Sequence, residues 1–533
     1  MTKPNRKYLL RFEGVNLGEI IDDTDQISAR RGGGLMMLDA AGSLPSMLDP
    51  AVGKRLNEIQ TGASIGLFEF ESDSVEEAHS IRAAVEKVLE TGALSYRDFS
   101  GKEARLPLKH GTFVVDIVKI DPEESDYNAV QRVIAKNRFR QLQQPTLSLD
   151  GIWDRGKNEP CFYNGIRVGQ SKVDLPGESD QQALSHSVRD RREYGRGARQ
   201  RFYRRELGRE DDFDLKFTND LQTLADAKSF GKSLDQSSGQ VDDGFNRNGR
   251  RTIPQSLNQK LAIFYVDGNG FGDLGAQILG SENGLEGYRQ WSTGLKVHHR
   301  QLLDGLLEMV QTDPFWRTAK DEIRLETLLW GGDEILWVVP AWKGWQLAKW
   351  FFSQEHQIND RQVAYACGVV FCNAKAPIKN GIRLARELGD LAKQATQSHG
   401  LAYEVLESFD DVTVQLAEHR KRFVPSGEES VDQLVIQPQR LVKFWDRLIQ
   451  LSQESQFPIR QLYRFVNAWI HSKTSEMSES RSRLIDGCRD CGVNIDSYLS
   501  EWGEEVGWLH LLQIMPYLKG VLENQVQKIE VTS

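Results

Sequence analysis

Asp267, Asp333 and Glu334 are the residues of this sequence whose types and spacing could do chemistry. Each follows or precedes an apolar run typical of a buried strand, and each lies in a glycine-rich motif: FYVDGNGFGDLG holds Asp267, and LLWGGDEILWVV holds the other two. The second motif has the pattern of a hairpin, with a strand, a tight turn and another strand. We expect the first strand and this hairpin to be neighbours in one sheet, which brings the three carboxylates to one edge.

Carboxylates that crowd a partly buried site repel one another, and a divalent cation relieves that repulsion. Mg²⁺ prefers a few carboxylate oxygens together with phosphates and water. The expected cofactor is therefore Mg²⁺ or Mn²⁺, with Asp267, Asp333 and Glu334 as metal ligands. Two such ions can activate an attacking hydroxyl and hold a leaving pyrophosphate. In this scheme Glu334 binds the second metal or helps to deprotonate the hydroxyl.

Three glycines and one lysine complete the predicted site. Gly268, Gly331 and Gly332 carry no side chain, so the backbone can approach a bound nucleotide closely. Lys393 lies late on a helix predicted over 377–397 and is expected to hold a triphosphate, although an ordinary solvated lysine is the alternative. Each motif alone is typical of a simple turn, whereas their order and strand contexts together favour metal–nucleotide chemistry.

The elements that must position these residues indicate an α+β fold with four regions. Strand- and helix-like runs alternate over 1–125 and again over 256–410, and the second series has the order βαββαβ with an extra helix. We predict two ferredoxin-like palm domains there, the second one catalytic. Residues 126–255 are expected to be loop-rich, with a flexible loop over Gly231–Arg251. Residues 411–533 have a helical pattern and are predicted to form a C-terminal helical bundle.

Composition excludes several classes of protein. The 533 residues include 39% hydrophobic and 27% charged residues, an ordinary balance that excludes a wholly disordered chain. No apolar stretch approaches the ~18 residues of a membrane helix, and the N-terminus lacks the apolar core of a secretory signal. Five cysteines fit a reducing cytoplasm. The pair Cys488 and Cys491 is interpreted as reduced thiols at a turn in a helical region rather than as a zinc site.

Two further clusters leave their roles open. Residues Arg189–Arg209 include nine arginines and three acids, in a chain whose net charge is −9. This run could bind RNA or a nucleotide phosphate, or it could be a solvated helix face paired with nearby acids such as Glu210, Asp211 and Asp212. Seven tryptophans lie between Trp291 and Trp350. Core packing is the favoured interpretation for most of them, and base stacking by one is the alternative.

The second α+β region resembles the polymerase-like large subunit of type III CRISPR effector complexes and, more distantly, GGDEF nucleotide cyclases. The resemblance is carried by YVDGNGFGDLG, WGGDEILWVVP and ACGVVFCNAKAPIKNGIRLARELGDLAKQ, within Lys260–Ser408. A weaker resemblance covers QISARRGGGLMMLDA, Gln26–Ala40, after the opening strand of the first region. No glycine-glycine-acid hairpin occurs over 1–125, so the first palm is expected to be catalytically inert.

The resemblance implies ATP as substrate, a cyclic nucleotide or cyclic oligoadenylate as product, and a role in antiviral defence. It implies guide RNA, other effector-complex subunits and a downstream effector that senses the product as partners. The sequence also departs from the family. It has no His-Asp dipeptide, so DNA cleavage by an HD nuclease domain is not expected. The turn is GGDE rather than GGDD, and the four-cysteine zinc site is reduced to Cys161. Ile335 stands where GGDEF cyclases have Phe.

Two other functions remain open at this point. The protein could be a scaffold subunit that binds nucleotide or RNA without turnover. It could also be a template-dependent polymerase, because the palm chemistry is shared.

Overall fold

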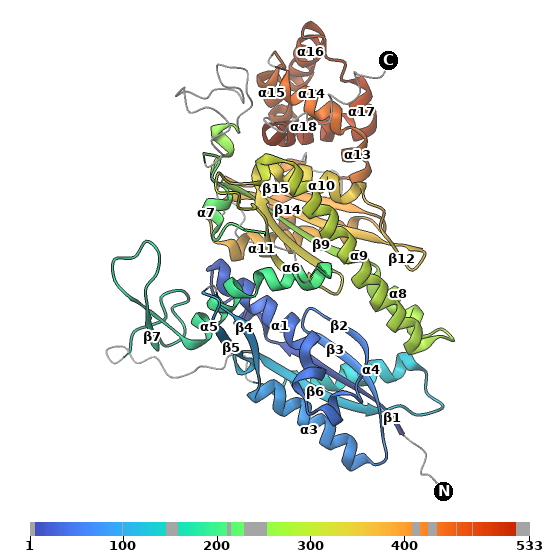
Figure 1. Cartoon of the computed structure of the whole chain (residues 1–533). Coiled ribbons are helices and arrows are strands. Elements are labelled where there is room, and N and C mark those ends of the chain that lie inside the picture. Colours follow the sequence, from blue (N-terminus) through green and yellow to red (C-terminus); the bar gives the residue numbers. More distant parts are fainter. Residues whose placement is uncertain are drawn as a thin grey trace.

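The structure of the chain is a computed structural model. It describes residues 6–98, 100–144, 158–209, 215–228, 253–407, 416–424, 434–454, 456–471 and 473–518. The loop expected over Gly231–Arg251 and the acids Glu210, Asp211 and Asp212 lie outside these residues. Figure 1 shows two sheets stacked along the long axis of the molecule, with a group of helices beyond the second sheet.

The first sheet has the strand order β2-β3-β1-β6, and its neighbouring strands are antiparallel. Alternating residues explain its two covered faces: Leu10 and Phe12 face the main core, whereas Leu9 packs with Val130 and Val133 of α4. The first region therefore includes α4, beyond residue 125. Its elements are β1 (Arg6–Val15), α1 (Ile27–Met47), α2 (Pro50–Gly53), β2 (Asn57–Gly62), β3 (Ile65–Ser72), α3 (Val75–Thr91), the hairpin β4 (Ala93–Arg97) and β5 (Glu103–Pro107), β6 (Thr112–Lys119) and α4 (Asp126–Gln141).

The second sheet repeats this arrangement with one more strand, in the order β10-β11-β9-β14-β15. Its opening strand lies between the hairpin and a later strand, as in the first sheet, and this is the order expected of a βαββαβ unit. Only β15 is parallel to its neighbour, β14. The elements are β9 (Lys260–Asn269), α8 (Phe271–Leu279), α9 (Gly284–Thr312), β10 (Glu326–Gly331), β11 (Glu334–Pro340), α10 (Ala341–Ser353), β12 (Gln357–Ile358), β13 (Arg361–Gln362), β14 (Ala364–Asn373), α11 (Ile378–Ala395) and β15 (Gly400–Val405).

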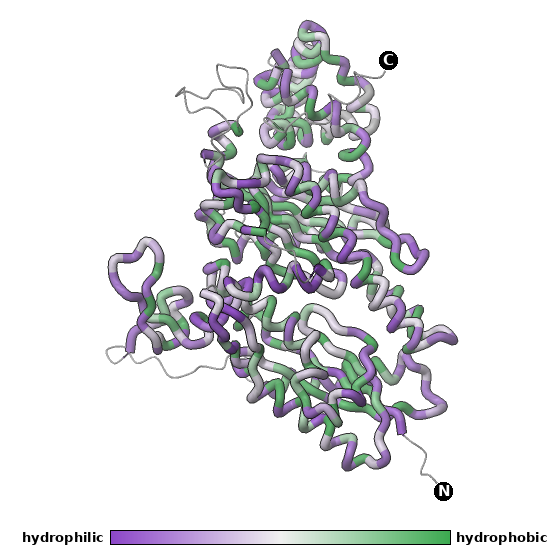
Figure 2. The backbone as a smooth tube through the Cα atoms, viewed as in Figure 1, coloured by the Kyte–Doolittle hydropathy of each residue, from purple (hydrophilic) through white to green (hydrophobic). Residues whose placement is uncertain are grey.

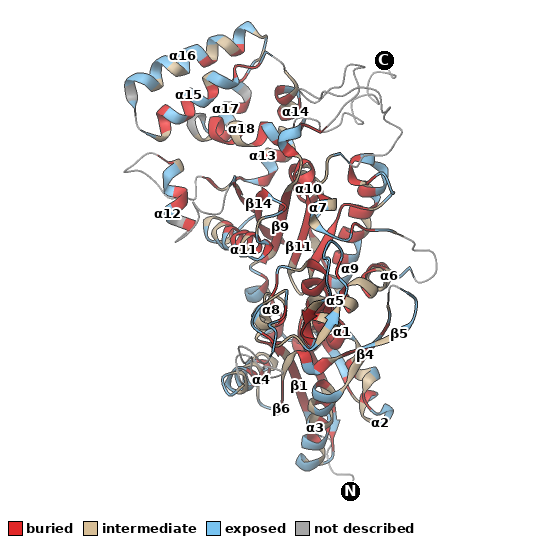
Figure 3. Ribbon diagram, turned by 90° about the vertical axis from the view of Figure 1, so that its left-hand side faces the viewer, coloured by how far each residue is buried: buried red, intermediate tan, exposed pale blue. Residues whose placement is uncertain are grey.

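Both faces of the second sheet are buried, which explains the nearly continuous apolar run of β9. Ile263 and Tyr265 pack in the same cluster as Leu388 of α11, whereas Phe264 faces α10 and lies 5.8 Å from Phe351 between ring centroids. Figure 3 shows β9, β11 and β14 as buried strands. Helix α11 therefore covers the face of the sheet on which Asp267 lies, because Asp267 is two residues beyond Tyr265.

The segment between the sheets contains more helix than expected for a loop-rich region. Its described elements are β7 (Ser171–Val173), β8 (Gln182–Leu184), α5 (His186–Gly197), α6 (Arg199–Leu207) and α7 (Leu221–Leu224). Helix α5 packs closely on α1, since a Cβ atom on Gly32 would lie 1.8 Å from the carbonyl oxygen of Arg191. Figure 2 shows the hydrophilic helix α6 between the two sheets.

The C-terminal region is helical, as predicted. Residues 438–453 form two helices that meet at Phe444. The described helices are α12 (Leu416–Arg420), α13 (Pro438–Lys443), α14 (Trp445–Gln453), α15 (Ile459–Ile470), α16 (Thr474–Asp490), α17 (Asp496–Trp502) and α18 (Glu504–Leu518). Helix α18 docks on the second sheet, where His510 Nδ1 lies 2.8 Å from the Tyr403 hydroxyl. No described helix is both long enough and apolar enough to cross a membrane.

Candidate functional site

The three predicted carboxylates meet at the end of β9 and the tip of the β10–β11 hairpin. Asp267 and Glu334 are direct cross-strand partners. The backbone amide of Gly268 donates a hydrogen bond of 3.1 Å to the carbonyl oxygen of Asp333, which fixes the turn beside the strand. The structure therefore brings together Asp267, Asp333 and Glu334 at one sheet edge, as the sequence predicts.

Lys393 belongs to the same site, because its ammonium forms an ion pair with the Asp267 carboxylate. Burial raises the pKa of Asp267 to about 7; Lys393 opposes this shift, and the neighbouring Asp333 and Glu334 charges add to it. Burial also raises the pKa of Asp333, and Glu334 contributes in the same direction. The site thus holds more negative charge than one lysine compensates.

Glu334 has a partner that the sequence analysis did not identify. The Tyr265 hydroxyl donates a hydrogen bond to Glu334 Oε1, and the Arg386 guanidinium lies 5.9 Å from the centre of the Tyr265 ring. The signal was available in principle, because residues two apart on a strand share a face. Tyr265, Asp267 and Glu334 therefore line the face that α11 covers.

The three glycines have different surroundings. A Cβ atom on Gly268 would lie 2.5 Å from the Phe271 ring, so this position is closed by the protein itself. Gly331 has φ 140°, and its Cβ would lie 2.3 Å from the Ala63 amide nitrogen in the turn between β2 and β3. Gly332 has φ 62° and faces open space. Of the three positions, Gly332 is the one with room for a ligand beside the backbone.

The turn of the β2–β3 hairpin in the first sheet contacts the turn of the β10–β11 hairpin in the second sheet, beside this site. A pocket of about 260 Å³ adjoins their contact. It is lined, among others, by Thr61 and Gly62 of the first hairpin, Gly331 and Gly332 of the second, and Lys296 and Arg300 of α9. The walls of the pocket thus carry mixed charge, because its lining also includes Glu58, which pairs with Lys296, and Glu206.

The donor set fits one class of metal site. Within the described ranges, no group of three or more His, Cys, Asp or Glu side chains is placed to hold a metal ion. Asp267 and Asp333 are nevertheless adjacent, with raised pKa values that a cation would lower. Mg²⁺ is usually held by one or two carboxylates plus substrate phosphates and water. Two adjacent carboxylates match that chemistry better than they match a closed all-protein cage.

Most arginines of the run Arg189–Arg209 interact with other groups of the protein. Arg199 lies 3.1 Å from Glu326, and Arg209 lies 2.6 Å from Asp304. The Asp39 carboxylate forms ion pairs with two arginines of α6, Arg201 at 2.7 Å and Arg205. Of the two interpretations left open, pairing with acids describes these arginines, but the acids come from distant parts of the chain and several of the arginines are buried rather than solvated.

The tryptophans and cysteines are structural in the described chain. Six of the seven tryptophans between Trp291 and Trp350 are buried, which confirms the core interpretation for them.

Cys488 and Cys491 are free thiols at the end of α16, and Cys491 Sγ lies 3.2 Å from the Cys488 carbonyl oxygen.

Comparison with known proteins adds a fold relationship to this geometry. No protein-family model matches the chain, and no curated protein matches its sequence. Among solved structures, a Csm1–Csm4 cassette in complex with cA4 matches with a TM-score of 0.52 and 14% identity over 97% of this chain and 71% of that one. The cassette with one ATP gives a TM-score of 0.53 at 14% identity, covering 96% and 70%. Csm1 from T. onnurineus gives 0.51 at 14% identity, covering 96% and 69%. The resemblance read from the sequence is thus confirmed at the level of the fold: over nearly its whole described length, this chain is built like the Csm1 subunits of type III CRISPR complexes.

Proposed function

We propose that this protein is a metal-dependent nucleotidyltransferase that makes a cyclic nucleotide or a cyclic oligoadenylate from ATP. The observation that carries the proposal is the convergence of Asp267, Asp333 and Lys393 at the GGDE hairpin. The fold supports the substrate, because the similar Csm1–Csm4 cassettes were solved with ATP, pppApA, pppApApA, cA3 and cA4. That series is what stepwise adenylyl transfer followed by ring closure would contain.

The proposed reaction joins two nucleotides. A 3′- or 2′-hydroxyl oxygen of one nucleotide forms a bond to the α-phosphorus of another, and the bond from that phosphorus to the bridging oxygen breaks. Pyrophosphate leaves with the electron pair, and the hydroxyl proton passes to the Glu334 carboxylate or to water. Asp267 and Asp333 would hold Mg²⁺ or Mn²⁺, which supplies charge neutralisation at the phosphates. Lys393 is close enough to exchange Asp267 for a triphosphate oxygen.

In this proposal, one of the two reacting nucleotides binds in the pocket beside the GGDE turn. Arg300 and Lys296 would provide cations, with phosphate replacing Glu58 as the partner of Lys296, and Gly332 leaves the backbone open at the edge of the pocket. The direct test is incubation of the protein with each NTP and Mg²⁺ or Mn²⁺, with pyrophosphate measured and products identified by mass spectrometry. A cyclic oligoadenylate from ATP supports the proposal. No pyrophosphate under any condition, including addition of a target RNA and partner subunits, contradicts it.

A second candidate function is favoured by one observation. Two of the predicted catalytic carboxylates already have ordinary protein partners, Lys393 for Asp267 and Tyr265 for Glu334. Lys393 and Tyr265 therefore offset part of the repulsion without a metal, which suits a scaffold that binds nucleotide without turnover. Calorimetry with a non-hydrolysable ATP analogue separates the two: tight binding with no product from ATP favours the scaffold.

We also propose the setting implied by the fold. The protein would act in antiviral defence with guide RNA and other effector-complex subunits, and its product would be sensed by a downstream effector. Purification of the tagged protein from its native host, followed by sequencing of bound RNA and identification of bound proteins, tests this setting independently of catalysis.

A further inference from the structure

A groove on the first region carries exposed arginines that the proposed catalytic site does not use. The groove has a volume of about 860 Å³ and lies between the β4–β5 hairpin and the start of α6. Four arginines line it, Arg97 and Arg105 from the hairpin and Arg201 and Arg204 from α6, against two acids, Asp98 and Glu103. In a chain whose net charge is −9, this is a local cationic surface.

Arg97 and Arg105 point away from the core. Strand alternation buries Leu94, Tyr96 and Leu106, which puts Arg97 and Arg105 on the exposed face of the hairpin. In the part of the chain that the structure describes, neither guanidinium has an ion pair or a side-chain hydrogen bond. Figure 3 shows this hairpin as an exposed edge beside α5. Both cations are therefore available to an external anion.

In the described structure, the two acids of the groove form no ion pair with Arg97 or Arg105. Asp98 Oδ1 accepts hydrogen bonds from the backbone amides of Ser100 and Lys102, at 2.8 and 3.0 Å, so its carboxylate closes the hairpin turn. Glu103 is the cross-strand partner of Arg97, but no ion pair joins their side chains in the described structure. Even with Arg201 paired to Asp39, the three other arginines outnumber the two acids in the lining of the groove.

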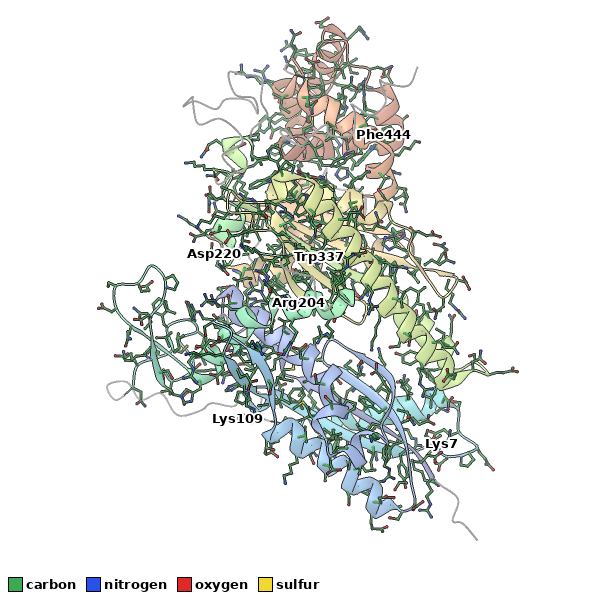
Figure 4. The ribbon with its side chains drawn as sticks, viewed as in Figure 1. Lys7, Lys109, Arg204, Asp220, Trp337 and Phe444 are labelled. Atoms are coloured by element: carbon green, nitrogen blue, oxygen red, sulfur yellow. The ribbon has the colours of Figure 1, made fainter. Side chains whose placement is uncertain are left out.

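The walls of the groove are held rigidly. Arg201 donates one hydrogen bond of 2.7 Å to the Ser95 carbonyl oxygen and another of 2.7 Å to Asp39, so it fastens α6 to the hairpin. A Cβ atom on Gly197 would lie 2.4 Å from the Arg97 carbonyl oxygen, which shows how closely the hairpin packs on the end of α5. Figure 4 shows Arg204 on α6, between the two sheets. Preformed walls reduce the ordering cost of binding.

We infer that this groove binds the phosphodiester backbone of a single-stranded nucleic acid. Guanidinium groups match phosphate oxygens in charge and geometry. Arg97 and Arg105 are diagonal neighbours on antiparallel strands, about 7–8 Å apart, so each can take a separate phosphate of one strand. The walls are polar and carry several cations, whereas sites for small molecules are mostly apolar with few polar groups. An extended polyanion fits better than a single nucleotide.

The test is fluorescence anisotropy with a labelled 20-nucleotide oligo(U), measured over a range of salt concentrations with the full chain. The variant is Arg97→Gln with Arg105→Gln, and the matched control is Arg460→Gln with Arg464→Gln, which removes the same charge from the exposed face of α15. We expect the groove variant to bind at least tenfold more weakly. The slope of log K against log salt should fall by about 1.4, because each phosphate contact on a single strand contributes about 0.7.

The outcomes separate the possible ligands. Equal loss for oligo(U) and oligo(dT) supports a backbone site that does not read the 2′-hydroxyl, and loss for oligo(U) alone supports an RNA-specific one. Unchanged affinity and salt slope in the groove variant would overturn the inference, as would an equal loss in the α15 control. Groove-dependent binding of polyglutamate as tight as that of oligo(U) would overturn it in favour of an acidic protein partner. None of these measurements depends on catalysis, so they stand or fall apart from the proposed enzyme activity.

Discussion

The ammonium of Lys393 is paired with the carboxylate of Asp267, the acid that a catalytic metal would need. The lysine and a metal ion would therefore compete for the same negative charge. The triphosphate of a bound nucleotide offers Lys393 a replacement partner at the moment when a metal arrives with that triphosphate. This exchange would let the site remain stable when empty and accept Mg²⁺ together with its substrate.

Replacing Lys393 with Met should weaken nucleotide binding more than the chemical step. The half-buried Asp267 would lose its only cationic partner among the described residues, and we expect the free energy of unfolding at pH 8 without metal to fall by about 1–3 kcal/mol. The apparent KM for ATP should rise, with a smaller change in kcat. Added Mg²⁺ should restore stability more in the variant than in the wild type. Denaturant unfolding with and without Mg²⁺ and steady-state pyrophosphate assays measure these effects, and an unchanged KM would contradict the assigned role.

Replacing Asp267 with Asn, or both Asp333 and Glu334 with Ala, should abolish product while the protein remains folded. Each change removes a proposed metal ligand, and losing such electrostatic stabilisation costs several kcal/mol of barrier, or at least about 100-fold in rate. Without metal, the melting temperature should be unchanged or slightly higher, because one or two of the three repelling acids are gone. The matched control is Glu308→Ala, an exposed acid on α9. Product formation by the double variant at the wild-type rate would disprove the site assignment.

The sequence predicts the elements of the site better than their partners. The apolar runs and the glycine pair locate β9 and the β10–β11 hairpin within a residue or two, and the cross-strand placement of Asp267 and Glu334 follows from ferredoxin-like strand order. These features depend on local pattern.

The features that the sequence analysis missed depend on contacts between remote segments. The Tyr265–Glu334 hydrogen bond requires knowing which strand pairs with the hairpin in which register. The docking of α4 on the first sheet, and the acids that meet the arginine run, are set by how whole regions pack. Sequence spacing contains no direct information about such pairs, since Arg31 and Glu326 are 295 residues apart yet touch.

Replacing Tyr265 with Phe should lower kcat with little change in KM. The ring and its packing against α11 would remain, whereas Glu334 would lose the hydroxyl that orients its carboxylate. Burial holds the pKa of Tyr265 far above its usual range, so the hydroxyl is a hydrogen-bond donor at every working pH. Loss of one hydrogen bond should cost about 1 kcal/mol of stability. A parallel Tyr403→Phe variant, which removes a buried hydroxyl bonded to His510, controls for stability alone. Equal effects of both variants on kcat would assign Tyr265 a purely structural role.

Replacing Glu326 with Gln should strongly destabilise the packing of the first region on the second sheet. The Glu326 carboxylate accepts two hydrogen bonds from Arg31, at 2.6 and 2.5 Å, and lies 3.1 Å from Arg199. All three side chains are buried. Removing the shared anion leaves two guanidinium groups without charge compensation, which typically costs about 3–5 kcal/mol. Glu479→Gln, in an exposed pair with Arg483, should change stability by less than about 0.5 kcal/mol. Urea unfolding of the two variants makes the comparison, and similar costs would contradict a structural role for the buried group.

Acidification should destabilise the protein through a histidine cluster beside the second sheet. His356 Nδ1 lies 3.3 Å from His298 Nε2, and the His399 ring lies 5.2 Å from that of His356. Burial lowers the pKa of His356 to about 3 and that of His298 to about 4, and it lowers the pKa of His399 as well.

The sign of the effect follows from these shifts. Below pH 6.5 the unfolded chain binds protons at these positions while the folded protein does not, so the stability that they contribute is complete above pH 6.5 and is lost as the pH falls toward 3–4. Each such histidine adds a slope of about 1.4 kcal/mol per pH unit in that window. His356→Phe should therefore flatten the pH dependence of the free energy of unfolding between pH 6.5 and pH 4, even where it lowers stability at pH 7.5. The exposed His79 is the matched position, and His79→Gln should leave the slope unchanged. Equal slopes in wild type and His356→Phe would show that the cluster does not set the acid sensitivity of the fold.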